Sequence, residues 1–193
     1  MSRGLGDVYK RQLRLCMDIV RSGLTGEELF VTEELLAREP EKLAALSACC
    51  QTTYVISEAV AERLTATRNP QGIFCVLPTL DKQGDRNTIE KMDRLGRYIL
   101  LENVQDPANL GAVSRTAEAL GLSGMIVSGG CDIYNPKALR ASMGALLRIP
   151  VHVTGDVPET LRTAGENGMK TYASVPNRGA VPVTECRFGD GII

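Results

Sequence analysis

The residues best suited to chemistry in this 193-residue chain are Asn109 and Arg115, which follow a short apolar run. An asparagine amide donates and accepts hydrogen bonds, and the planar guanidinium of arginine grips phosphate or carboxylate through paired N–H groups. Arginine stays charged at physiological pH, so it is a poor base but a good clamp for anions. Its alternative role is a surface salt bridge on a helix. The two side chains predict a site that handles an anionic substrate.

Periodicity predicts the elements around these residues. Residues 98–101 form an apolar run typical of a buried strand, and Asp106 followed by Pro107 is a helix-start signature. Apolar residues then recur at helical spacing. Polar residues thus gather at the carboxyl end of a strand, which is where open α/β sheets bind ligands. Glu102, the nearest carboxylate, either anchors Arg115 or is solvated.

Downstream of residue 97, short apolar runs alternate with helical periods. Strict alternation of strand and helix implies a parallel sheet. The expected strands are 98–101, 125–127, 149–153 and 171–175, and the expected helices are 107–120, 136–147 and 158–164.

The first part of the chain has the pattern of a separate small α/β unit. A helix is expected to begin at Leu13 and to end near Gly23, because glycine is the usual residue after a helix C-terminus. The other expected elements are strands at 29–31, 54–56 and 73–77, a helical pattern through Leu43, Leu46 and Cys50, a helix capped by Ser57, and a turn at 68–72.

Three segments stand apart from these two units. Residues 1–12 are glycine-rich and basic without periodicity, so we expect either a disordered arm or a foreign leader. Residues 79–95 are expected to form a polar linker and a lead-in helix, whose N-cap signature lies in 87–90. Residues 189–193 begin a new apolar run and stop, which predicts a chain truncated at its C-terminus.

Composition and charge narrow the class of protein. The 22 Lys plus Arg residues are balanced by 23 Asp plus Glu, so any nucleic-acid site must be a local patch. Six cysteines without a C-x-x-C pair, together with a single histidine, argue against zinc and against a secreted disulfide framework, and we expect no metal. No apolar run approaches the roughly 18 residues that a membrane span needs. These features favour a cytoplasmic protein.

Two ordered segments carry a family resemblance. Residues 101–121, with Asn109 and Arg115, and residues 135–151 resemble the first two motifs of the SpoU (TrmH-type) RNA ribose 2′-O-methyltransferases of the SPOUT superfamily. The resemblance implies an α/β fold with a parallel-sheet domain of the trefoil-knot type over residues 96–193, lacking its final knotted segment. It also implies methyl transfer from S-adenosylmethionine to a ribose 2′-hydroxyl in rRNA or tRNA by a homodimer.

Residues 13–78 resemble the small ribosomal-protein-like α/β domain that binds the RNA substrate in many members of this family. The turn over residues 69–72 is its most recognisable mark. The acidic residue and glycine that usually precede its first helix are replaced here by Arg11 and Gln12.

The resemblance also implies roles for individual residues. Arg115 matches the catalytic arginine of the family, and we expect it to grip the target phosphate and to stabilise the developing alkoxide. We expect Asn109 to orient Arg115 or to hold the loop at the strand edge. Ser142, in the second motif, either assists the substrate or packs in a tight helix contact. The residues expected to bind RNA phosphates are Lys137, Arg140 and Arg148.

The expected cofactor site is incomplete. Ser174, Val175 and Gly179 lie where the resemblance places a loop that contacts S-adenosylmethionine. The third motif of the family, a G-N-E-G-like turn that supplies much of the pocket, would begin after Ile193 and is missing. No G-x-G-x-x-G sequence follows a strand, so an ordinary Rossmann site is not a substitute.

Two other hypotheses stay open at this point. One is a non-catalytic RNA-binding module whose second domain only dimerises, which the missing third motif favours. The other is an unrelated α/β enzyme that binds a phosphorylated small molecule at the strand edge. The pairing of Asn109 with Arg115 favours the methyltransferase over both.

Overall fold

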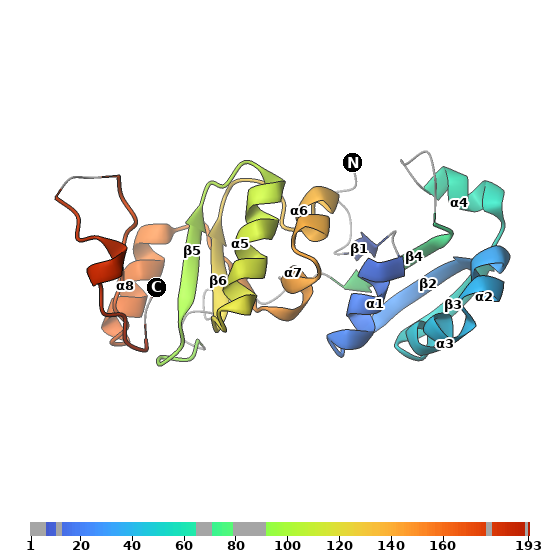
Figure 1. Ribbon diagram of the computed structural model, residues 1–193, viewed down its shortest axis with the longest axis horizontal. Helices are drawn as coiled ribbons and strands as arrows, with labels where there is room; N and C mark the ends of the chain where they lie inside the picture. Colours follow the sequence, from blue (N-terminus) through green and yellow to red (C-terminus); the bar gives the residue numbers. More distant parts are fainter. Residues whose placement is uncertain (1–6, 11–12, 65–70, 79–91, 177–178, 192) are drawn as a thin grey trace. The chain divides into compact units, whose positions relative to one another are not determined.

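The structure, a computed structural model, describes residues 7–10, 13–64, 71–78, 92–176, 179–191 and 193. The chain divides into two compact units, residues 1–80 and 81–193. The boundary lies in the predicted linker at 79–95, most of which is outside the described residues, together with its lead-in helix. Each unit is considered by itself below (Figure 1).

In the described part of the first unit, a four-stranded mixed sheet has the order β1-β4-β2-β3. β2 and β3 run parallel, whereas β4 is antiparallel to both β1 and β2. The strands are β1 (Asp7–Lys10), β2 (Gly26–Thr32), β3 (Cys50–Ile56) and β4 (Ile73–Pro78), and the helices are α1 (Leu13–Arg21), α2 (Glu33–Arg38), α3 (Pro40–Ala48) and α4 (Glu58–Leu64).

The core of this unit follows from alternation along β2. Leu29 and Val31 are buried, whereas Glu28 and Phe30, which point to the opposite face of the sheet, are only partly buried. Further buried apolar side chains come from the helices and from β4: Cys16, Ile19, Leu35, Leu43, Leu46, Ile73, Cys75 and Leu77.

Local signals in this unit act much as predicted. α1 ends before Gly23, whose φ of 63° and N–H bond to the Val20 carbonyl close the helix. Ser57 Oγ accepts from the Val60 N–H at the start of α4. Cys50, predicted to continue a helix, instead begins β3, because α3 stops at Ala48 and the next residues pair with β2.

Residues Asp7–Lys10 contradict the disordered arm, one of the two alternatives expected for residues 1–12, and the foreign leader stays a prediction. They form β1 and pair antiparallel with the edge of β4. The physical reason is that a sheet edge presents unpaired backbone groups, which a neighbouring segment can satisfy through its backbone whatever its side-chain periodicity.

The second unit contains the predicted parallel sheet. Among the described residues, β5 (Tyr98–Glu102), β6 (Gly124–Ser128) and β7 (Val151–Val153) pair in parallel in the order β5-β6-β7. β7 begins after Pro150, which has no N–H to donate to a ladder. The other elements are α5 (Pro107–Ala119), α6 (Pro136–Ala141), α7 (Ala145–Arg148), α8 (Val157–Glu166) and the 3-10 helix η2 (Val183–Glu185).

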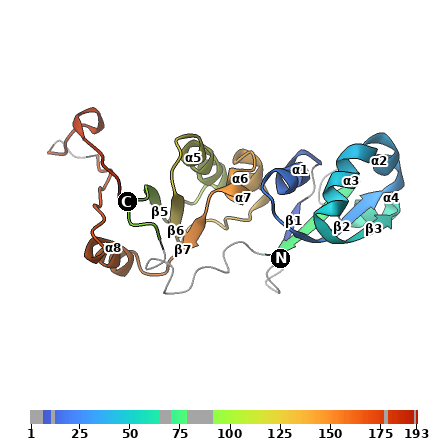
Figure 2. The same ribbon diagram turned by 90° about the horizontal axis from the view of Figure 1, so that it is seen from below.

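Helices cover both faces of this sheet. α5, α6 and α7 lie on one face and α8 lies on the other (Figure 2). On the α8 side, Tyr98 and Ile126 pack with Ala164 of α8 and with Met169. The predicted α/β architecture with a parallel sheet is therefore confirmed.

The helix predicted at 136–147 is wrong in its middle. It is two helices, α6 and α7, separated by Met143 with φ 51° and Gly144 with φ 88°. Apolar periodicity continues across the break, but a positive φ at two successive residues cannot belong to a right-handed helix. Glycine adopts this conformation at little cost, so Gly144 marks the turn.

The strand predicted at 171–175 is also wrong. Residues 171–176 form no strand, and their side chains are exposed. The Lys170 and Tyr172 N–H groups donate to the carbonyls of Gly191 and Ile193, and the Ile193 N–H donates back to the Lys170 carbonyl. The segment has strand-forming residues but buries no face against the sheet, and strand propensity without burial is a weak determinant.

Candidate functional site

The loops after β5 and β6 are joined at the carboxyl edge of the sheet. The Asn103 N–H donates to the Ser128 carbonyl over 2.7 Å, and the Cys131 N–H donates to the Val104 carbonyl over 2.9 Å. A Cβ atom on Gly130 would lie 2.4 Å from the Val104 oxygen, so the close approach needs glycine. These bonds fix the loop from which α5 begins.

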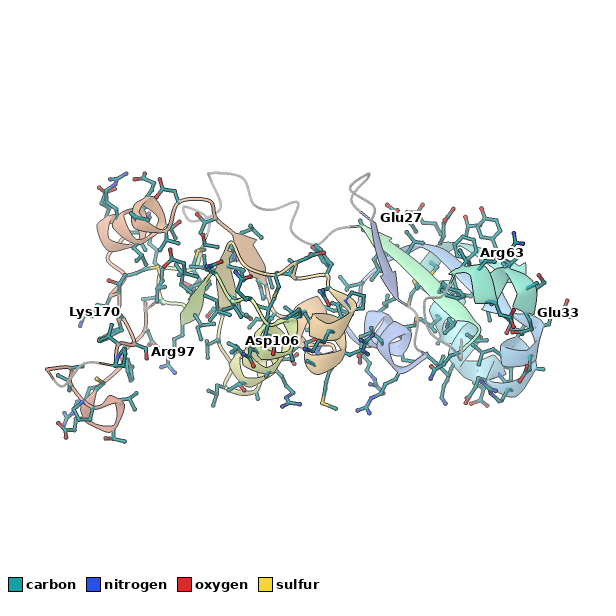
Figure 3. The ribbon with its side chains drawn as sticks, turned by 90° about the horizontal axis from the view of Figure 1, so that it is seen from above. Glu27, Glu33, Arg63, Arg97, Asp106 and Lys170 are labelled. Carbon is teal, nitrogen blue, oxygen red and sulfur yellow. The ribbon has the colours of Figure 1, made fainter. Side chains whose placement is uncertain are left out.

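Asp106 links the N-termini of α5 and α6. Its Oδ1 accepts from the Ala108 N–H over 3.0 Å, which caps α5, and from Lys137 Nζ over 2.9 Å. The Ala108 hydrogen bond and then the Lys137 ammonium hold the pKa of the Asp106 carboxyl below its usual value. Figure 3 labels this aspartate beside α5. Lys137, predicted to bind RNA phosphate, is thus already paired with a carboxylate.

α5 and α6 pack at very short range. A Cβ on Gly111 would lie 2.4 Å from the Ala138 carbonyl oxygen and 2.8 Å from the Ser142 nitrogen. Ser142 is fully buried, and its Oγ donates to the Leu139 carbonyl over 2.8 Å. Of the two roles considered for Ser142, this geometry supports packing and not contact with a substrate. The small residues of the second motif serve this helix contact within the chain.

Arg115 is exposed on α5 and reaches the break between α6 and α7. Its Nη1 donates to Met143 Sδ over 3.4 Å, and about half of the Met143 side chain is exposed. Asn109 is exposed near the start of α5. Arg115 lies six positions after Asn109, which places the two residues about 9 Å apart along the helix axis and on different faces. Among the described residues no hydrogen bond joins these two side chains.

Arg148 is held by two partners. Its Nε and Nη2 atoms donate to the two carboxylate oxygens of Glu118 over 2.5 and 2.9 Å, and Nη2 also donates to the Met143 carbonyl over 3.2 Å. Because its charge is offset, Arg148 fits a structural tie between α5 and α7 better than the predicted RNA contact. Arg140 is exposed and forms no ion pair with any described residue.

The predicted cofactor residues lie in the segment that follows α8. Ser174, Val175 and Gly179 are exposed and belong to no helix or strand. In the described portion of the chain no group of three or more His, Cys, Asp or Glu residues could hold a metal ion. The helices described there include none with the length and apolar character needed to cross a membrane.

Family comparison decides what this α5–α6 arrangement belongs to. The profile of the SpoU rRNA Methylase family matches residues 96–192, which is half of the chain. The chain belongs to the SpoU rRNA methylase family. The profile for RNA 2′-O ribose methyltransferase substrate binding matches residues 13–83.

Relatives of this SpoU chain include two curated bacterial proteins. It is 29% identical over 153 residues to the 23S rRNA (guanosine(2553)-2′-O)-methyltransferase RlmP of Bacillus subtilis. The aligned segment covers 78% of the chain and 57% of the relative. It is 34% identical over 125 residues to an uncharacterized tRNA/rRNA methyltransferase of Synechocystis, covering 64% of the chain and 44% of the relative. The chain thus spans about half the length of these relatives.

A solved structure shows the same fold. The AdoMet-bound rRNA methyltransferase from Sinorhizobium meliloti superposes with a TM-score of 0.76 at 22% identity, covering 97% of this chain and 69% of the other. The similarity extends over both units, and it supports the fold of each.

Sequence reasoning missed two residues of this candidate site. Met143 contacts Arg115, and Asp106 pairs with Lys137 as well as capping α5. The Met143-Gly144 pair inside a helical pattern was the available signal, because an internal glycine often marks a turn. No signal in the sequence pairs Asp106 with Lys137, since 31 positions separate them.

Proposed function

We propose that the protein containing this chain transfers a methyl group from S-adenosylmethionine to a ribose 2′-hydroxyl of ribosomal or transfer RNA. The observation that carries the proposal is Arg115, an exposed guanidinium on the first SpoU motif that touches Met143 of the second motif. Membership of the SpoU family and the RNA methyltransferases among its relatives support the substrate class.

Arg115 has the chemistry that this reaction needs from a side chain. It binds the phosphate next to the target ribose through paired N–H groups and stabilises negative charge that develops on the 2′-oxygen. Water or the phosphate accepts the hydroxyl proton, because a guanidinium is too weak a base. Contact with Met143 Sδ restricts the rotamers of Arg115 before RNA binds.

S-adenosylmethionine is the methyl donor in this proposal, and when bound it supplies an electrophilic methyl group. The described residues do not by themselves enclose it. Ser174, Val175 and Gly179 are exposed, and residues 171–176 form no strand that would wall a pocket. We therefore assign no step to these three residues.

RNA binding in this proposal relies on the substrate-binding domain and on Arg140. Arg140 is exposed on α6, close in sequence to the Arg115 contact at Met143. The proposal also includes a homodimer, as the family resemblance implies, and a cytoplasmic location, where rRNA and tRNA are found and free cysteines stay reduced. Sedimentation of the purified protein tests the dimer.

The test is methylation of unmodified ribosomal and transfer RNA by the complete protein with labelled S-adenosylmethionine. Mass spectrometry of the digested RNA should show a 2′-O-methyl nucleoside, and the product should depend on Arg115. A methyl group on a base instead of a ribose would overturn the reaction class. RNA binding without methylation of any RNA, and without binding of the donor, would favour a non-catalytic RNA-binding module.

A further inference from the structure

The substrate-binding domain carries an aromatic row on one face of its sheet. Phe30 of β2 lies opposite Tyr54 of β3 and opposite Phe74 of β4 at a single register, so three aromatic side chains cross three adjacent strands. The Phe30 and Tyr54 rings stack with centroids 5.1 Å apart and an interplanar angle of 17°. The chain has only three phenylalanines, and two of them lie in this row.

The aromatic row is only partly buried in the protein core. Phe74 is buried, Phe30 is partly buried, and 44% of the Tyr54 side chain is exposed. An exposed aromatic ring beside a stacked one offers a flat apolar surface. Bases of single-stranded nucleic acid stack on such surfaces, whatever their sequence.

A pocket opens beneath α4 over two members of this row, Phe30 and Phe74, and Tyr54 lies beside it. Its volume is about 440 Å³, within the range of small-ligand sites. Phe30 and Phe74 line it from the sheet, and the aliphatic side chains Ile56, Val60 and Leu64 complete its apolar lining. One flat aromatic ring system fits between an aromatic floor and an aliphatic wall.

Two charged residues line the same pocket and define what enters it. Arg63, which Figure 3 labels on α4, is exposed and forms no ion pair with any described residue. Glu28, on the sheet face that carries Phe30, supplies carboxylate oxygens that only accept hydrogen bonds. An arginine suits a phosphate, and a carboxylate suits the edge of a base that presents adjacent N–H donors.

We propose that this pocket binds one unpaired nucleotide of the RNA substrate, with its base on the aromatic row, its phosphate at Arg63 and its donor edge at Glu28. Guanine presents two adjacent donors, N1–H and the amino group, on its Watson–Crick edge, so it is the preferred base. This inference rests on the proposed RNA substrate and adds the class of nucleotide that the first domain reads.

The test measures binding of fluorescein-labelled RNA hexamers to the whole protein by anisotropy. The probes are 5′-UUUGUU-3′, 5′-UUUAUU-3′, 5′-UUUUUU-3′ and a hairpin whose G·C-clamped stem pairs the first sequence with its complement. The guanine hexamer should bind at least about fivefold tighter than the uracil hexamer, and the hairpin should bind weakly because the bases of its stem are unavailable.

Variants locate the site. Phe30→Leu should weaken the guanine hexamer about tenfold, the scale of losing one stacked base. Tyr54→Ala should weaken it less, because Tyr54 supports Phe30 by stacking beside the pocket. Glu28→Gln should remove the preference for guanine. Arg63→Gln should weaken all single strands and lower the salt dependence of binding. The matched controls are Arg14→Gln on α1 and Val55→Ala, whose side chain lies on the opposite face of β3 from Tyr54.

Three results would overturn the pocket: no binding of any hexamer, equal binding of all four probes, or equal losses in the control variants. In an NMR titration with the guanine hexamer, chemical-shift changes confined to residues outside the pocket would also exclude this pocket. Methylation of RNA at wild-type rates by Tyr54→Ala and Phe30→Leu proteins that also bind the hexamers normally would reject the pocket and leave the methyltransferase proposal intact. Hexamer binding as described without any methylation would reject only the methyltransferase.

Discussion

Arg115 Nη1 donates to Met143 Sδ over 3.4 Å, and this contact joins the two motifs that identify the family. Met143 occupies the left-handed break between α6 and α7, with φ 51°, and Gly144 follows with φ 88°. If α6 and α7 formed one continuous helix, the Met143 side chain would point in another direction and would not lie in this position beside Arg115. The break therefore determines where the guanidinium of Arg115 is held.

Substitution of Arg115 by Ala should reduce methylation by at least about a hundredfold, because one electrostatic partner of the transition state is lost. Arg115→Lys should also be poor, since a point charge cannot reproduce a paired grip on phosphate. The measurement is initial rate on unmodified RNA, with circular dichroism to verify folding. Undiminished methylation by a folded Arg115→Ala protein would exclude the role, and Arg14→Ala serves as the control arginine.

Two glycine-to-alanine substitutions in helices should have opposite effects on stability. Gly111→Ala places a Cβ 2.4 Å from the Ala138 carbonyl oxygen, so the free energy of unfolding should fall by about 2 kcal/mol or more. Gly165→Ala on α8 meets no atom within 4 Å and should raise it by about 0.5 kcal/mol through helix propensity. Urea unfolding measures both. A neutral Gly111→Ala would show that α5 and α6 do not pack so closely.

Arg140 and Arg148 should separate into different roles. Arg140→Gln should weaken RNA binding and lower its salt slope by about one unit, as expected for one lost phosphate contact. Arg148→Gln should leave the salt slope unchanged and cost about 1 kcal/mol of stability, because the pair with Glu118 is bidentate and about two-thirds buried. The measurement is a filter-binding titration at several salt concentrations. A lower salt slope for Arg148→Gln, with an unchanged slope for Arg140→Gln, would show that Arg148 is the RNA contact.

His152 should make stability depend on pH. Burial lowers the pKa of this imidazole below its ordinary value near 6.5, and its Nδ1 has no hydrogen-bond partner among the described residues. The unfolded chain therefore takes up the proton first as pH falls, and stability that is present above about pH 6.5 is lost toward the lower folded pKa. Urea unfolding at pH 7.5 and 5.8 measures the loss.

His152→Gln should reduce that loss over the same pH range. Because the chain has one histidine, its imidazole resonance can be titrated by NMR without assignment. A folded-state pKa at or above 6.5 would contradict the expected direction.

The sequence by itself determined the elements that depend on local patterns. The apolar run of β5, the Asp106-Pro107 start of α5 and the glycine end of α1 all lie where they were predicted, because capping and periodicity are properties of a few adjacent residues. The parallel sheet followed from the alternation of strand and helix. Family motifs likewise identified Arg115 and Asn109 as candidates.

Only the tertiary structure decided which of the candidates meet. Ser142 is buried by the contact between α5 and α6, Arg148 is paired with Glu118, and Lys137 is paired with Asp106. Residues 171–175 bury no face against the sheet, so their strand propensity had no effect. The contacts of Ser142, Arg148 and Lys137 depend on residues that lie far away in the sequence, and the lost strand depends on the absence of such a partner. Local sequence patterns contain no information about contacts of this kind.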